Sequence, residues 1–312
     1  MPLLIGFGFN VRFSLLTTLT CLAISHAANY NNVIDLWSFD VGEGKYTDWM
    51  GAIADDTPLS SLSIPGTHNS MAYHIDNSLL QTQNVYLAKQ LTDGIRYIDI
   101  TCRYQDSSIH VYYGPYETGH RLSTVLEEIF DFLDEHPRET VVLRIQRNGM
   151  FVDSKTFFET FDQNFVSGSY VGDRATQHIY TTDTHVISMA PTLGELRGKV
   201  FILENFETEH TVRYGLPWNE DTVTSYNHKF ATGELFLESK WSNIISHLSQ
   251  DPSPGSNKLR ITHTTARFRV SPINTAARNS PSTGMNRLLG QYLQGPSSKA
   301  HVLSPDMVVM DI

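Results

Sequence analysis

The chain has 312 residues, of which 40% are hydrophobic and 18% charged, a composition typical of globular proteins rather than disordered ones. Its 33 acidic and 23 basic side chains give a formal net charge of −10, which argues against a nucleic-acid-binding protein because such proteins need a basic surface. Two cysteines, Cys21 and Cys102, exclude a disulfide scaffold.

The first 27 residues have the pattern of a secretory signal. Arg12 provides a basic start, an apolar run extends from Phe13 to Ile24, and small residues follow at Ala27 and Ala28. The apolar run is shorter than the ~20 residues that a membrane-spanning helix needs. We therefore expect residues 1–27 to be removed and the mature chain, 28–312, to be secreted to the extracellular space.

Strand-like and helix-like segments alternate along the mature chain. A capping box beginning at Thr124 predicts a helix that ends before Pro137. The apolar residues of this helix fall at helical spacing, at Val125, Leu126, Ile129, Phe130 and Leu133. Strands are expected just before His68 and at 94–100, 109–113, 140–146, 199–204, 259–263 and 307–312, with a further helix at 285–293.

This alternation predicts the fold class, α/β with a parallel sheet and crossover helices. The number of short apolar strands favours a single-domain, closed (β/α)8 barrel over an open sheet. In such barrels the functional residues gather at the carboxyl ends of the strands. One rim is therefore expected to hold the polar residues that end these strands, His68, Asp99, Gln146, Glu204, His263 and Asp311.

Three short motifs resemble the X region of phosphatidylinositol-specific phospholipases C. They are Ser63–Asn69, Gly94–Asp99 and Tyr113–Pro115, and the likeness is greatest to the short, secreted, single-domain members of bacteria and fungi. Segments 191–203 and 308–311 extend the resemblance over about residues 62–311. The resemblance implies a distorted (β/α)8 barrel that cleaves phosphatidylinositol, or its glycan-linked forms, at a membrane surface. We expect a monomer that binds no nucleic acid.

The resemblance also assigns roles to individual residues. The substrate carries its own nucleophile, the inositol hydroxyl beside the phosphodiester, so the enzyme supplies a base, a positive group and an acid. His68 matches the family's general base, Asp311 the carboxylate that orients it, and Asp99 an acidic position of the second motif. The products are diacylglycerol and a cyclic inositol phosphate.

Three positions depart from the bacterial pattern. Asn69 replaces an aspartate, Thr101 replaces an arginine, and Tyr113 stands where most members have the second catalytic histidine. The base side of the site is therefore retained and the acid and charge-stabilising side is altered. Two readings follow: a working phosphodiesterase, or a catalytically impaired relative that binds a phosphoinositide or another extracellular ligand.

Three residues are alternatives for the missing groups. Arg103 shares a strand face with Thr101 and could offer the positive charge. Tyr113 can donate a proton, although its reference pKa of ~10 suits this task less well than that of histidine. His110 lies at an odd spacing from Tyr113, so a regular strand would direct it to the opposite face.

Metal-dependent relatives also carry an asparagine at position 69, which raises the alternative of a Ca²⁺ site. Asn69, Asp99 and Gln146 offer oxygen atoms, but only one of them is charged, whereas Ca²⁺ usually recruits several carboxylates. We therefore expect no required cofactor. A glycerophosphodiester hydrolase on the same barrel would need a glutamate-rich metal site, for which the sequence offers no pattern.

The remaining candidates are substrate-binding residues. Arg144 and Gln146 alternate on one strand face and could bind inositol hydroxyls, although Arg144 could equally form a structural ion pair. Asn69, Glu204 and His263 are candidates because of their positions at or just after strand ends. The relatives continue into a last helix beyond the position of Asp311, so we expect either that the chain, which ends at Ile312, has been shortened there or that such a helix is supplied otherwise.

Overall fold

The computed structural model describes most of the chain from residue 46 onward. The described residues are 46–75, 77, 79–148, 154–182, 187–207, 214–227, 234–250, 257–265, 271–277, 283–294 and 307–311. The expected signal, 1–27, lies outside them. Among the described residues, no helix is both long and apolar enough to cross a membrane.

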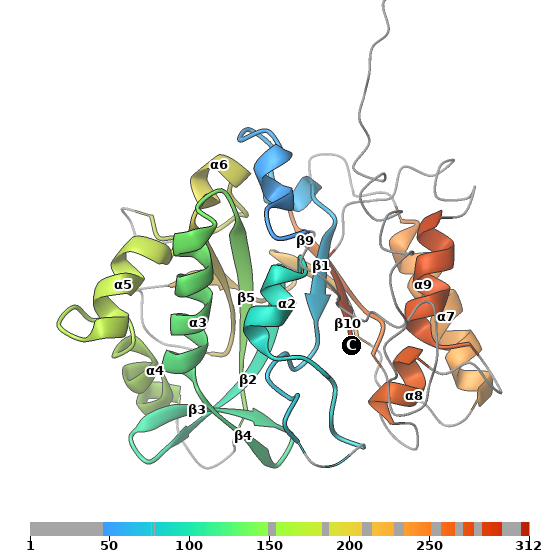
Figure 1. The fold of residues 1–312 in the computed structure, drawn as a ribbon, viewed down its shortest axis with the longest axis horizontal. Helices are drawn as coiled ribbons and strands as arrows, with labels where there is room; N and C mark the ends of the chain where they lie inside the picture. Colours follow the sequence, from blue (N-terminus) through green and yellow to red (C-terminus); the bar gives the residue numbers. More distant parts are fainter. Residues whose placement is uncertain are drawn as a thin grey trace, which may run out of the picture.

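Eight parallel strands form the main path of one sheet, in the order β7-β6-β5-β2-β1-β10-β9-β8. The path begins at β7 and ends at β8, so within the described residues no ladder joins these two strands. The hairpin β3–β4 extends antiparallel from β2 (Figure 1). The strands are β1 (Ile64–Thr67), β2 (Tyr97–Gln105), β3 (Ser108–Tyr113), β4 (Tyr116–Arg121), β5 (Thr140–Arg147), β6 (Lys199–Asn205), β7 (Gly215–Pro217), β8 (Val223–Tyr226), β9 (Leu259–His263) and β10 (Met307–Met310).

Helices cover the outer face of the curled sheet in two groups. In Figure 1, α3, α4 and α5 lie against the half that contains β2 and β5, and α7, α8 and α9 lie on the side of β9 and β10. The helices are α2 (Leu87–Thr92), α3 (Leu122–Glu135), α4 (Ser154–Asp162), α5 (Tyr170–His178), α6 (Leu193–Leu196), α7 (Glu234–Leu248), α8 (Pro272–Ala277) and α9 (Met285–Gln294), with 3₁₀ turns at Trp49–Ala52 and Leu59–Ser61.

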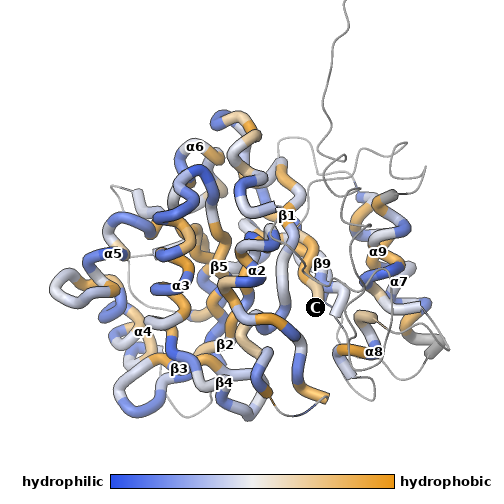
Figure 2. The backbone as a smooth tube through the Cα atoms, viewed as in Figure 1, coloured by the Kyte–Doolittle hydropathy of each residue, from blue (hydrophilic) through white to orange (hydrophobic). Residues whose placement is uncertain are grey.

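Alternation along each strand divides the apolar side chains between two cores. Ile98 and Ile100 of β2 face outward and belong to the core beneath the helices, whereas Tyr97 belongs to the core inside the barrel. Figure 2 shows hydrophobic colour along the central strands, while the helix α3 alternates between hydrophobic and hydrophilic residues. The inner core fills the barrel below the site, so the polar residues that continue the inward alternation are left at the carboxyl ends of the strands.

Gly66 in β1 is required by this inner packing. A Cβ atom at position 66 would lie 2.8 Å from the Cβ atom of Tyr97, whose fully buried ring fills the barrel beside it. Only glycine therefore allows β1 and β2 to pair at this level, where Gly66 is in register with Tyr97.

Most of the expected elements are confirmed, and three differences concern their bounds and pairing. The helix expected from Thr124 begins at Leu122. Arg121 is its N-cap residue, and Thr124, the third residue of the helix, accepts a hydrogen bond from the Arg121 backbone N–H through Oγ1. The segment 109–113 is a strand, but it pairs antiparallel with β2 and does not belong to the parallel path. The strands β4, β7 and β8 were not expected, because β4 is largely exposed and β7 and β8 are too brief to show an apolar pattern.

Candidate active site

His68 follows β1 at the carboxyl end of the barrel and is held there by its backbone. Its N–H donates to the Met310 carbonyl of β10, and its carbonyl accepts from Gln83 Nε2 at 2.6 Å. The chain turns sharply at the next residue, Asn69, which has a φ of 44°. Asparagine is one of the few residues other than glycine that tolerate this left-handed conformation. The turn leaves the His68 ring buried among the strand ends.

The two nitrogens of His68 have different partners, which define its tautomer. Nδ1 lies 2.8 Å from Asp99 Oδ2, and Nε2 lies 2.7 Å from Asn69 Nδ2. A carboxylate accepts only and an amide nitrogen donates only, so Nδ1 carries the proton and Nε2 presents its lone pair to Asn69. An imidazole in this form is ready to act as a base through Nε2. The carboxylate at Nδ1 is thus Asp99, whereas the resemblance had assigned that role to Asp311.

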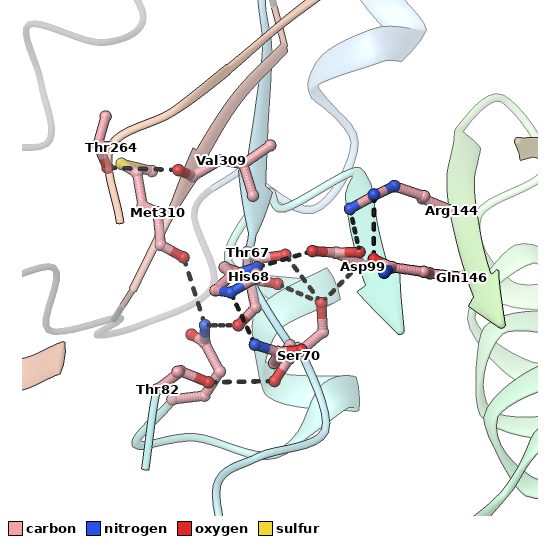
Figure 3. A network of polar contacts seen from close by, with 12 residues as sticks. Thr67, His68, Ser70, Thr82, Asp99, Arg144, Gln146, Thr264, Val309 and Met310 are labelled. Carbon is pink, nitrogen blue, oxygen red and sulfur yellow. Dashed lines mark hydrogen bonds and ion pairs between the residues drawn. The ribbon is translucent and has the colours of Figure 1, made fainter. Parts of the chain in front are cut away.

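Asp99 lies between His68 and a guanidinium (Figure 3). Its Oδ1 accepts from Arg144 Nη1 at 3.0 Å, and both side chains are buried. Burial alone would raise the pKa of Asp99, but the charge of Arg144 and the hydrogen bond from His68 outweigh burial and hold this pKa well below its usual range. The carboxylate is therefore ionised whenever the protein is folded near neutral pH.

Arg144 is surrounded by groups from its own strand, from β6 and from the residue that follows β7. Its Nη2 donates to Gln146 Oε1 at 3.1 Å, and the Asn205 amide, with its oxygen turned toward the guanidinium, accepts from Nε and Nη2. The guanidinium carbon lies 4.3 Å from the centre of the Trp218 ring, close enough for a cation–π contact. The predicted face shared by Arg144 and Gln146 is confirmed, and the predicted ion pair of Arg144 is present as well.

His263 and Asp311 complete the site from the C-terminal half of the chain. The His263 ring stands edge-on to that of His68, with 5.6 Å between the ring centres and 88° between the planes. Asp311 follows β10 and is buried, and its backbone carbonyl accepts from Asn286 Nδ2 at 3.0 Å. Continuing the β1–β10 register, in which Thr67 pairs with Met310, places Asp311 beside His68. The expected convergence on one rim is therefore correct for His68, Asp99, Gln146, His263 and Asp311.

Glu204 is a correction to that expectation. In the β5–β6 ladder it pairs with Ile145, whose side chain belongs to the outer core, so Glu204 faces the helices rather than the barrel interior. Its Oε1 accepts the backbone N–H of Tyr214 at 2.8 Å. The inward residue is Asn205, which the sequence reasoning missed. Period-two counting from Leu203, an inner-core residue, is the signal that would have found it.

Arg103 is a second correction. It does lie on the face of Asp99 and Thr101, as the spacing predicted, but four residues along an extended strand separate its Cα atom from that of Asp99 by roughly 13 Å. Its guanidinium carbon lies 4.4 Å from the centre of the Tyr112 ring, and Nη2 donates to the Gly114 carbonyl. Arg103 therefore braces the hairpin, and the positive charge beside Asp99 belongs to Arg144.

Tyr113 is the third correction. In the β2–β3 ladder Tyr112 pairs with Thr101 and Val111 pairs with Cys102, so the alternation directs Tyr113 to the outer face with Cys102. His110, which pairs with Arg103, lies on the inner face, as its odd spacing from Tyr113 predicted. His110 Nδ1 is 2.5 Å from Glu117 Oε1 within the hairpin. The arrangement therefore supports neither Tyr113 nor His110 as the acid that acts opposite His68.

The donor set does not fit the Ca²⁺ alternative. Of the three expected ligands, the Asn69 amide is turned with its nitrogen toward His68, and Gln146 and Asp99 are both hydrogen-bonded to Arg144. The guanidinium of Arg144 already neutralises Asp99, the one carboxylate of the set, and this positive charge would repel a divalent cation. His68, Asp99 and His263 have donor atoms within 4.8 Å of one another, but their carboxylate is the same Arg144-bound Asp99.

Comparison with known proteins places this site in a characterised family. The model of the phosphatidylinositol-specific phospholipase C X domain matches residues 56–205, which include His68, Asp99 and Arg144. The chain is 32% identical over 234 residues to the 1-phosphatidylinositol phosphodiesterase of Listeria monocytogenes, covering 70% of this chain and 68% of that protein. The enzyme of the same name from Staphylococcus aureus is 28% identical over 160 residues, covering 50% of this chain and 49% of the relative.

The fold agrees with the same family. The solved structure of phosphatidylinositol-specific phospholipase C from Listeria monocytogenes has a TM-score of 0.70 and 27% identity, covering 85% of this chain and 93% of that one. A distorted, barrel-like α/β fold, expected from the sequence, is thereby confirmed.

Proposed function

Because this chain belongs to the phosphatidylinositol-specific phospholipase C X-domain family, we propose that it cleaves phosphatidylinositol, or its glycan-linked forms, into diacylglycerol and a cyclic inositol phosphate. One observation carries the proposal. At the carboxyl end of the barrel, Asp99 contacts both His68 and the buried Arg144, and it orients His68 so that Nε2 is the basic nitrogen. This arrangement provides a base and a cation for an intramolecular displacement at phosphorus.

Each of these groups has a role in the reaction. The inositol hydroxyl beside the phosphodiester replaces the Asn69 amide at His68 Nε2, which takes the hydroxyl proton as the oxygen attacks phosphorus. The ionised Asp99 stabilises the imidazolium that forms. Arg144 supplies positive charge for the phosphoryl oxygens, and it is oriented in advance by Gln146, Asn205 and Trp218. Since attack is intramolecular, positioning of the inositol ring contributes much of the acceleration.

The setting of the reaction is also proposed. The pattern of residues 1–27 supports export of the protein. The exported protein would act as a monomer on lipid at a membrane surface, and it would bind no nucleic acid. Export can be tested by N-terminal sequencing of the protein recovered from the medium, which should begin near Ala28.

The enzymatic assignment is tested on vesicles of phosphatidylinositol. The wild-type protein should release cyclic inositol phosphate equally with and without Ca²⁺, and His68→Ala should lower the rate by about 10²–10⁴-fold because the general base is removed. His136→Ala is the matched control, since His136 pairs with Asp48 beyond the C-terminal end of α3, away from the site.

The outcomes separate enzyme from binding protein. If wild type and His68→Ala are equally silent yet both bind the vesicles, the chain is the impaired, ligand-binding relative that the departures at Thr101 and Tyr113 suggest. A rate that depends on Ca²⁺ would contradict the conclusion that Arg144, bound to Asp99 and Gln146, leaves no Ca²⁺ site among these residues.

A further inference from the structure

The proposed reaction needs an acid to protonate the departing glycerol oxygen. In this chain, the residue at the position of the family's second catalytic histidine cannot supply that proton. Tyr113 occupies the position, and the β2–β3 register turns it to the outer face with Cys102. The inward residue of β3 is Tyr112, but its hydroxyl donates to Gln105, toward the far end of the hairpin. Burial and the nearby Glu117 raise the pKa of Tyr112, which makes it a weaker acid.

His263 lies where such an acid is required. It is the last residue of β9 and fully buried, and it continues the inward alternation of Leu259 and Ile261, which belong to the inner core. Its ring faces that of His68 edge-on at 5.6 Å. Donor atoms of His68, Asp99 and His263 all lie within 4.8 Å of one another. Both imidazoles can therefore contact the same phosphoryl group and the oxygen atoms bonded to it.

The backbone around His263 is held rigidly, which a proton donor needs. Its carbonyl accepts from Lys240 Nζ at 3.3 Å, a buried lysine on α7. His263 pairs with Val309 of β10, and the next residue, Thr264, donates its N–H to the Val309 carbonyl at 3.0 Å. The ring is therefore presented by a packed strand rather than by a loop.

We propose that His263 is the general acid of the reaction assigned above, on which this inference rests. His68 Nε2 accepts the proton of the inositol hydroxyl, the new P–O bond forms, and the P–O bond to glycerol breaks as an N–H of His263 gives its proton to the glycerol oxygen. The products, cyclic inositol phosphate and diacylglycerol, account for all atoms. His68 ends the step protonated and His263 neutral, and proton exchange with solvent restores both.

Histidine suits this role better than the neighbouring carboxyl group. Asp311 is also at the strand ends, but an aspartic acid with a reference pKa of ~3.9 is ionised near neutral pH, whereas a histidine with a reference pKa of ~6.5 retains a protonated fraction there. His110, the other inward histidine of this region, is engaged by Glu117 in the hairpin.

The test compares two lipids in the same vesicles: phosphatidylinositol, and its phosphorothiolate analogue in which sulfur replaces the glycerol oxygen bonded to phosphorus. A thiolate leaves without protonation, so the analogue does not need the acid. His263→Gln should slow cleavage of the oxygen ester by about 10²–10⁴-fold and of the sulfur ester by less than about 10-fold. His68→Ala should slow both. The alkaline limb of the pH profile for the oxygen ester should disappear in His263→Gln.

Two controls keep the outcomes distinct. His247→Gln alters a histidine that contacts Thr262 on the outer face of the same strand, at 2.7 Å, and should leave both rates within a few-fold of wild type. Equal losses on both lipids in His263→Gln, or no loss on either, would overturn the assignment of the acid. If the wild-type protein cleaves neither lipid, it is the proposed function that fails.

Discussion

At the residue scale, the site depends on one buried ion pair. Asp99 accepts from both His68 and Arg144, so a single carboxylate orients the base and holds the cation. Breaking a buried pair by removing one partner leaves an uncompensated charge, which typically costs ~3–5 kcal/mol. Substitutions in this pair should therefore affect stability and activity together.

The two arginines of the inner face should respond differently to substitution. Arg144→Ala should lower kcat/KM by about 10²–10³-fold, because it removes the charge next to the reacting phosphoryl group, and Arg144→Lys should restore part of the loss. Arg103→Ala should change kcat/KM by less than about 10-fold, because its guanidinium braces the hairpin. Initial rates on phosphatidylinositol vesicles measure both, and an equal loss in the two alanine variants would contradict the assignment.

The pKa of Asp99 predicts how stability depends on pH. Because the pKa in the folded state lies below the unfolded value of ~3.9, the stabilisation from the ionised group is complete above about pH 4 and declines as the pH falls further. Asp99→Asn removes this component, so its free energy of unfolding should be lower than that of wild type at pH 7 and should vary less with pH below 4. Urea denaturation across the acid range measures this.

Asp131→Asn is the control for that series. Asp131 is an exposed partner of Arg174, and exposed pairs contribute at most ~1 kcal/mol. The prediction for Asp99 is wrong if the two variants lose the same stability at pH 7.

At the element scale, β1 depends on the absence of a side chain at its centre. Gly66→Ala would place a Cβ atom 2.8 Å from Cβ of Tyr97, so β1 and β2 would have to separate, at a cost of ~1–3 kcal/mol in the free energy of unfolding. Gly51→Ala is the matched control, because its Cβ atom would meet no atom closer than 3.8 Å, on Arg138. Urea denaturation should show a loss only for the first variant, and equal losses would exclude the packing explanation.

The sequence predicts elements and faces better than it predicts neighbours. Long apolar runs such as 140–146 and 259–263 show their strand character locally, and alternation correctly placed Arg144 and Gln146 on one face. It is harder to predict which polar residue at a strand end faces the barrel interior. A shift of one residue in the strand pairing decides between Glu204 and Asn205. Arg103 was misjudged because four residues of extended strand separate it from Asp99, and Tyr113 was misjudged because its face depends on how β3 pairs with β2.

At the scale of the whole molecule, the first and last described strands pair at the centre of the sheet. Ile64–Thr67 of β1 is in register with Met307–Met310 of β10, and β10 also pairs with β9. The strand at the end of the chain therefore joins the two groups of strands that precede it.

Truncations at the two ends should consequently have opposite effects. Removing residues 307–312 leaves β1 and β9 without their shared partner and should abolish cooperative unfolding and near-ultraviolet circular dichroism. Removing residues 1–27 should leave both signals unchanged, since that segment is the expected signal. A C-terminal truncation that still unfolds cooperatively would show that β10 is dispensable for the fold.

The bond from the His68 N–H to the Met310 carbonyl has a consequence for biosynthesis. A ribosome delivers β1 long before β10, so the base cannot acquire its final surroundings until residues 307–311 have been made. Catalytic competence therefore requires that β10 has been made and has paired with β1. For a proposed lipid-cleaving enzyme, this order of assembly keeps chains that lack β10 inactive.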